Sequence, residues 1–124
     1  MTQSALQWLA FARDVARHRR LWTIQDDGGF PAPLTSSGKR AHPFWSTLPR
    51  VLRIIQAVAA YLIFRPHEVT WDAFRDDWIP GMERDGLLVG VNWSGPTARG
   101  YDVLPSEAKA RIEFEIAQLS KAAS

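Results

Sequence analysis

Histidines and closely spaced carboxylates are the side chains in this sequence whose types suit metal binding or acid–base catalysis. The three histidines, His18, His42 and His67, are scattered, and none belongs to a His-Glu-x-x-His pattern or to a pair at helical spacing. A metal site would need His42 and His67 to converge with Asp26 or Asp27, and the sequence alone does not show that they do. We therefore predict no metal site and no cofactor.

Three carboxylates stand close together in the second half of the chain, at Asp72, Asp76 and Asp77. Two acids four residues apart share one side of a helix, where they could bind a hard cation or take part in acid–base chemistry. Arg75 lies among them and can neutralise such neighbours. We interpret this group as a solvated helix face with simple surface ion pairs.

Nucleophilic catalysis finds little support in the sequence. Cysteine is absent, which excludes a thiol nucleophile and disulfides and is compatible with a reducing cytoplasm. The serines of 36–38 and 93–95 are not in the Gly-x-Ser-x-Gly pattern that a nucleophile elbow requires. Residues 36–39 resemble a phosphate-binding loop only superficially, because Pro33 and Arg40 occupy two of its required positions. The chain is predicted not to be an enzyme.

Six tryptophans in 124 residues could build either a core or a contact surface. Trp8, Trp71 and Trp78 fall on predicted core faces, where packing is the simpler role. By contrast, Trp45 and Trp93 stand at predicted strand ends beside loops, so we expect them to be exposed. If they share a rim with Tyr101, they form a contact surface.

Charge is distributed unevenly along the chain. Residues 1–65 hold nine basic and three acidic groups, a net +6, whereas residues 66–124 hold six basic and ten acidic groups, a net −4. A bipolar surface would follow if the halves stay apart in the fold, and it would suit an anionic partner or head-to-tail association. Interleaving of the halves would mix the charges instead.

Periodicity and turn residues predict the elements of the first half. Ser4 and Gln7 fit a capping box, and Thr47 is a plausible N-cap. Pro31 and Pro33 weaken the return strand of a hairpin, because proline cannot donate to a ladder. The expected elements are a helix at 5–18, strands at 21–25, 30–34 and 41–45 around a turn at 26–29, and a helix with the apolar face Val51, Leu52, Ile55, Val58, Ala59 and Leu62.

The second half begins with a helix capped by Thr70, which should kink or end near Ile79 because Pro80 lacks an N–H. Gly86 can take the left-handed conformation that closes a helix. Residues 87–93 are nearly all apolar, which indicates a central strand, and Gly90 lets an aromatic ring or backbone approach it closely. A strand at 101–104 and a helix capped by Ser106, with Ile112, Ile116 and Leu119 inward, complete the chain.

This order of elements predicts an α+β fold, with a small, mostly antiparallel sheet and three to four helices packed chiefly on one face. Length and composition fit one domain over residues 1–124. The longest apolar run, Ile54–Phe64, falls short of the ~18 residues of a membrane span, and residues 1–4 show no secretory signal. A cytoplasmic protein without membrane contact is therefore expected.

Several segments together resemble the bacterial family catalogued as domain of unknown function 2750. The similar segments are Trp22–Gln25 with the Asp27-Gly28 turn, Pro43-Phe44-Trp45, Phe74, Trp78–Met82 and Asp85–Trp93, within roughly residues 8 to 105. The helix after Trp45 departs from the family pattern in being less acidic and polar. The resemblance implies a small stand-alone cytoplasmic protein with no recognised catalytic residues.

Three functions are consistent with the sequence. The leading hypothesis is a non-enzymatic protein-binding module, such as an inhibitor or immunity-type protein, because the chain is short and its charge distribution could steer a partner. The alternatives are nucleic-acid binding through the basic first half, and a small-molecule binder or small enzyme with an aromatic pocket among Trp22, His42, Trp45 and Trp93. A homodimer is compatible with each. The candidate partner-binding residues are Arg19, Arg20, Arg40, His42, Trp45, Asn92, Trp93 and Tyr101.

Overall fold

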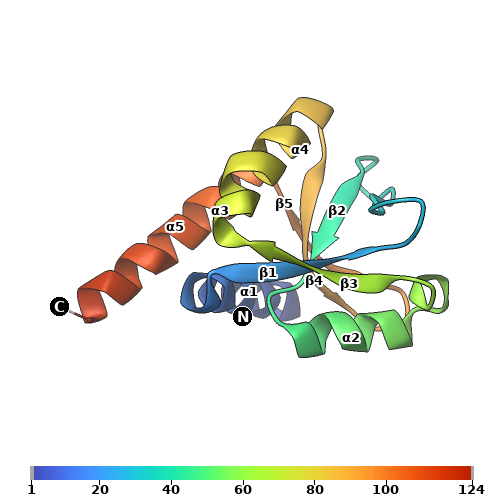
Figure 1. Cartoon of the computed structure of the whole chain (residues 1–124), viewed down its shortest axis with the longest axis horizontal. Coiled ribbons are helices and arrows are strands. Elements are labelled where there is room, and N and C mark those ends of the chain that lie inside the picture. Colours follow the sequence, from blue (N-terminus) through green and yellow to red (C-terminus); the bar gives the residue numbers. More distant parts are fainter. Residues whose placement is uncertain (1, 124) are drawn as a thin grey trace.

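Five strands form two small sheets in the computed structural model, which describes residues 2–123 (Figure 1). In the larger sheet, β4 (Leu88–Ser94) lies between β2 (Ala41–Phe44), to which it is parallel, and β5 (Arg99–Val103), to which it is antiparallel. In the smaller sheet, β1 (Arg20–Gln25) pairs with β3 (Arg65–Thr70) in antiparallel fashion. The central strand predicted over residues 87–93 is therefore β4.

Backbone hydrogen bonds between Trp22 and Trp45 join the two sheets. Each residue donates its N–H to the carbonyl of the other, at 2.8 and 2.7 Å. These bonds hold the middle of β1 against the end of β2, so that side chains of β1 reach the larger sheet. The result is an α+β architecture, as the order of predicted elements indicates.

The helices surround these sheets. Figure 1 shows α1 (Gln3–His18) behind β1, α2 (Leu48–Ala57) below the smaller sheet, and α5 (Pro105–Ala122) running past α1 to a C-terminal end away from both sheets. Between β3 and β4 the chain forms α3 (Trp71–Ala73), the π-helical turn η2 (Phe74–Trp78) and α4 (Ile79–Asp85). A short 3₁₀ turn, η1 (Ala59–Tyr61), follows α2. Within residues 2–123, no helix has the length and apolar character needed to cross a bilayer.

The apolar interior consists of two clusters separated by β4. Val89 and Val91 belong to the cluster formed with α1 and α5, whereas Leu88 and Trp93 belong to the cluster formed with α2 and η1. Trp93 would face the first cluster in a regular strand, because side chains alternate along a strand. Asn92 adopts a left-handed conformation, with φ of 48°, and the pairing with β5 shifts there, so Trp93 turns to the second cluster.

The residues that begin and end three of the helices are the ones that the sequence predicted. The hydroxyls of Thr47 and Thr70 accept hydrogen bonds from the third residue after each, and Gly86 closes α4 with φ of 70°, so all three predictions are confirmed. The missing N–H of Pro80 does not end the helix. Instead, the preceding turn widens into η2, in which the Ile79 N–H bonds to the Phe74 carbonyl five residues back.

Five sequence-based predictions about elements were wrong. Residues 30–34 form no strand, because their prolines cannot donate to a ladder, and β1 pairs with β3 instead. The α1 helix is capped by Thr2 rather than Ser4. The last helix begins at Pro105, and Glu107 rather than Ser106 satisfies its first free N–H, that of Leu104.

The fourth concerns the buried face of the helix after Thr47. It is formed by Val51 and Ile54, whereas Leu52 and Leu62 are exposed. The helix ends at Ala57, so Leu62 no longer follows its periodicity. The fifth concerns Leu119 of α5, which was expected to face inward and is exposed.

Candidate functional site

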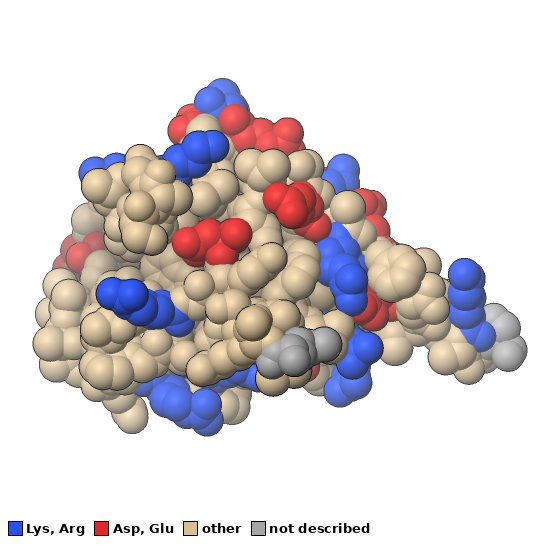
Figure 2. Space-filling view, turned by 180° about the vertical axis from the view of Figure 1, so that it is seen from behind, with Lys and Arg blue, Asp and Glu red and all other residues tan. Residues whose placement is uncertain are grey.

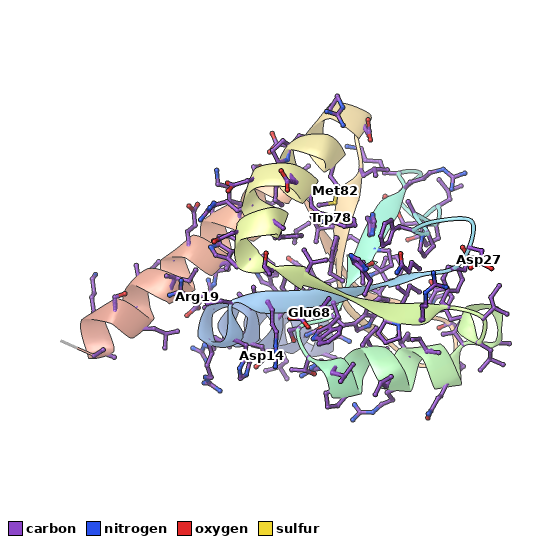
Figure 3. All side chains as sticks on the ribbon, viewed as in Figure 1. Asp14, Arg19, Asp27, Glu68, Trp78 and Met82 are labelled. Atoms are coloured by element: carbon purple, nitrogen blue, oxygen red, sulfur yellow. The ribbon has the colours of Figure 1, made fainter. Side chains whose placement is uncertain are left out.

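The π-helical turn η2 brings Asp77 and Trp78 to an open cleft that His42 of β2 also lines. Figure 3 shows Trp78 and Met82 on the side of this helical segment that faces β2. Single π turns inside helices occur frequently at functional sites, since they change which side chains face a neighbouring element. Here the chain between Asp77 and Asp85 forms one wall and His42 of β2 forms another. The cleft has a volume of ≈ 280 Å³ and is lined by His42, Asp77, Trp78, Gly81, Met82, Asp85 and Leu87.

His42 is the buried polar residue of this cleft, with 6% of its surface exposed. Its ring stacks on Phe44 at a centroid distance of 4.7 Å and meets Trp78 edge-on at 5.1 Å. Its Nε2 atom lies 3.1 Å from the Thr23 hydroxyl, which itself donates to the Pro43 carbonyl at 2.8 Å. The Thr23 oxygen must therefore accept from Nε2–H, which assigns the proton to Nε2 and leaves Nδ1 as an acceptor.

Burial lowers the pKa of His42 from 6.5 to about 4, because the apolar surroundings disfavour the imidazolium. The ring is therefore neutral at pH 7. It contributes aromatic surface and a hydrogen-bond acceptor to the cleft, but no positive charge.

The stability of the protein should fall in mild acid because of this residue. The folded-state pKa lies below that of the unfolded chain, so the unfolded state binds more protons as the pH drops. We expect His42 to cause a loss of about 2 kcal/mol in the free energy of unfolding between about pH 7 and pH 5. Urea denaturation at both pH values should show a smaller loss for His42→Phe, and an equal loss in both proteins would contradict the assignment.

The carboxylates at the cleft differ from those on the outer side of the same helix. Arg75 contacts Asp72 at 3.3 Å and Asp76 at 2.7 Å, and its hydrogen bonds lower the pKa of Asp76. Asp77 forms no ion pair within residues 2–123, and Asp85 has Arg84 at 3.6 Å. The surface-pairing interpretation is thus confirmed for two of the three carboxylates, while the third faces the cleft.

His67 lies near the same aromatic group without completing a metal site. Phe30 contacts both His67, at 5.1 Å between ring centroids, and Trp78, at 5.0 Å. Asp27 pairs with Arg65 at the far end of the β1–β3 ribbon from Arg19 (Figure 3). In the part of the chain that the structure describes, no three His, Asp or Glu side chains are placed to hold a metal ion.

Comparison with known proteins places this chain in a family. The family model described as "Protein of unknown function (DUF2750)" matches residues 9–112. The chain belongs to this family. No curated protein and no solved structure matches it. The matched span reaches from α1 to α5 and so includes every residue that lines the cleft. Membership in the domain of unknown function 2750 family confirms the resemblance seen in the sequence and assigns no activity.

The predicted aromatic rim does not exist in this family member. Trp45 is fully buried, with its indole N–H donating to the Trp93 carbonyl at 2.8 Å, and Trp93 is 5% exposed. Asn92 is buried as well, and its amide oxygen accepts from the Ser46 N–H. Tyr101 is exposed but stacks on Trp8. The expected exposure of the two tryptophans was wrong because both pack into the cluster formed with α2 and η1. The left-handed Asn92 decides that Trp93 enters this cluster and not the one formed with α1 and α5.

The candidate arginines are all exposed, but they do not converge. Arg19 follows α1 and donates to the Ala16 carbonyl, Arg20 lies 3.8 Å from Glu68, and Arg40 donates to the Ala32 carbonyl. Acidic and basic side chains interleave on the face seen in Figure 2. The charge asymmetry along the chain therefore does not produce a separate basic region on this face.

Of the candidate residues, His42 alone lines the cleft, and sequence reasoning missed the carboxylate that accompanies it. A residue two positions away on a helix faces a different side, so Arg75 could not pair with Asp77 while it paired with Asp72 and Asp76. This spacing was visible in the sequence. The partner of Asp77 in the cleft was not, because His42 is 35 positions earlier in the chain.

Proposed function

We propose that this protein is a non-enzymatic protein-binding module whose cleft receives a basic side chain, lysine or arginine, of a partner. The observation that supports this most is the carboxylate of Asp77, which forms no ion pair within residues 2–123. It lies in a cleft that Trp78 also lines and whose lining contains Asp85 but no lysine or arginine. With His42 neutral, the lining has a net charge of −2 near pH 7.

The lining offers the two interactions that a desolvated cation needs. Aromatic faces attract ammonium and guanidinium groups, and carboxylates form charge-assisted hydrogen bonds with them. Met82 and Leu87 supply apolar surface for the aliphatic part of a long side chain. The cleft is open to solvent, which suits a side chain presented by a larger partner.

The properties of His42 favour binding over catalysis. General acid–base catalysis is most efficient when the pKa of the group lies near the working pH. The pKa of about 4 is far from neutral, and Nε2 is committed to Thr23. We therefore assign to His42 a role in shaping the cleft and in keeping it free of positive charge.

The proposal predicts selective, salt-sensitive binding of a basic side chain. N-acetyl-lysine amide and N-acetyl-arginine amide should shift the indole N–H resonance of Trp78 in a saturable way, whereas the uncharged N-acetyl-norleucine amide should not. Asp77→Asn should weaken this binding roughly five- to tenfold, because one charge-assisted hydrogen bond is lost. The measurement is an NMR titration with the indole resonances assigned.

Asp76→Asn is the matched control, since it removes the same charge from the neighbouring position, where the carboxylate pairs with Arg75. Its affinity should stay within about twofold of the wild type. If both variants bind the basic amides equally weakly, the loss comes from the net charge of the protein and not from a contact with Asp77. Equal binding of all three amides would overturn the proposal.

A further inference from the structure

A second cavity lies away from the cleft and has no lining residue in common with it. It has a volume of ≈ 360 Å³ and opens between the loop at 33–36, the turn η1 and the connection from β4 to β5. Its lining is richer in polar groups than that of the cleft. The residues are Pro33, Leu34, Thr35, Ser36, Tyr61, Trp93, Thr97, Ala98, Arg99, Gly100 and Asp102.

Asp102 is a half-buried carboxylate held in a defined position. The indole N–H of Trp93 donates to its Oδ1 atom at 2.9 Å. Trp93 in turn lies against Gly100, where an added Cβ would be 2.7 Å from the indole and 2.9 Å from the Val91 carbonyl oxygen. Trp93 therefore orients the carboxylate through one oxygen, and the Oδ2 atom makes no hydrogen bond to any residue of 2–123.

Tyr61 is 9% exposed, yet its hydroxyl has no hydrogen-bond partner in the described part of the chain. Its ring packs against Phe64, and burial raises its pKa, so the hydroxyl stays protonated and can both donate and accept. The hydroxyl is not sealed from solvent, because Tyr61 lines the cavity and its oxygen is accessible. A hydroxyl in this position beside a cavity is suited to a ligand.

Arg99 adds a donor to the same cavity. It is exposed and forms no ion pair within the described residues. With Asp102 it makes the lining neutral overall, because the positive charge of the guanidinium cancels the negative charge of the carboxylate. The guanidinium only donates hydrogen bonds and the carboxylate only accepts them. The hydroxyls of Ser36, Tyr61 and Thr97 can do both.

We propose that this cavity binds a neutral polyhydroxyl compound of monosaccharide size, with Asp102 accepting from ligand hydroxyls, Arg99 donating to them and Tyr61 bonding to a third. Each hydroxyl of such a ligand both donates and accepts, which matches the mixed lining. An anion or a cation would place its charge beside a group of the same sign as well as the opposite one. The volume is near the lower end of the range for small-molecule sites.

The test is an NMR titration of the whole chain with glucose, galactose, mannose and myo-inositol, at up to roughly 50 mM because few hydrogen bonds support no better than millimolar affinity. At least one should cause saturable shifts at Gly100 and at the Trp93 indole N–H. Tyr61→Phe and Asp102→Asn should each weaken that binding roughly five- to tenfold. The asparagine keeps an oxygen that can accept from Trp93, and the phenylalanine keeps the ring, so both variants should fold.

Asp77→Asn is the matched control, because it affects the cleft and leaves this cavity unchanged; its polyol affinity should equal that of the wild type. A failure of polyol binding at this cavity can therefore be told apart from a failure of basic side-chain binding at the cleft. The inference is overturned if none of the four polyols binds, if Tyr61→Phe binds as tightly as the wild type, or if zwitterionic glycine or alanine binds and the polyols do not.

Discussion

Replacing Gly90 with valine is expected to lower the free energy of unfolding by about 4 kcal/mol, at the upper end of what overpacking costs. A Cβ atom at this position would lie 2.6 Å from the Cε2 and Cζ2 atoms of Trp93. The indole is buried and bonded to Asp102, so it cannot move aside without losing that contact. Because β4 is paired on both edges, its backbone cannot shift either.

The sign of this effect separates packing from strand propensity. Valine is among the best strand-forming residues and glycine among the poorest, so propensity alone predicts stabilisation. Gly81→Ala in α4 is the control, because the new Cβ would lie 3.5 Å from Arg84 Nη2 and helix propensity favours alanine by up to about 1 kcal/mol. Chemical denaturation measures both variants. A Gly90→Val protein as stable as the wild type would mean that Trp93 does not lie over β4.

Replacing Asn92 with alanine is expected to cost about 3 kcal/mol of stability, from two sources. The amide oxygen of Asn92 accepts the Ser46 N–H at 2.9 Å, and its loss leaves a buried donor unpaired, at a cost of roughly 1–3 kcal/mol. The φ of 48° is tolerated by asparagine but costs alanine roughly 1–2 kcal/mol.

Asn92→Gly separates the two contributions, because glycine removes the hydrogen bond but accepts positive φ freely. We expect it to be about 1 kcal/mol more stable than Asn92→Ala, though still below the wild type. Urea denaturation monitored by tryptophan fluorescence gives the comparison. Equal stabilities of the alanine and glycine variants would show that the backbone conformation contributes nothing.

Both predictions concern the same structural feature, the irregular backbone of β4 at Asn92. A regular strand would place residues 90 and 93 on opposite faces, and the left-handed Asn92 brings the Trp93 indole over Gly90 instead. The same change positions the Asp102 carboxylate through the indole N–H. The second cavity therefore depends on a backbone conformation in the middle of β4, and stability and ligand binding should be linked there.

Features that depend on neighbours in the chain were predictable. Thr47, Thr70 and Gly86 begin or end helices through hydrogen bonds and dihedral preferences that involve a few adjacent residues. The apolar run before Trp93 indicates a central strand, because only a strand covered on both faces buries every side chain. The close approach of an aromatic ring to Gly90 follows from the same reasoning and is confirmed.

Features that depend on contacts between distant segments could not be predicted from the sequence. The sequence by itself determined the α+β class, the family and the residue types available for binding. Tertiary structure alone decided that β1 pairs with β3, that Trp45 and Trp93 are buried, and that Asp77 and His42 share a cleft. Local preferences act over a few residues, whereas the pairing of strands and the convergence of side chains result from the packing of elements that are far apart in the chain.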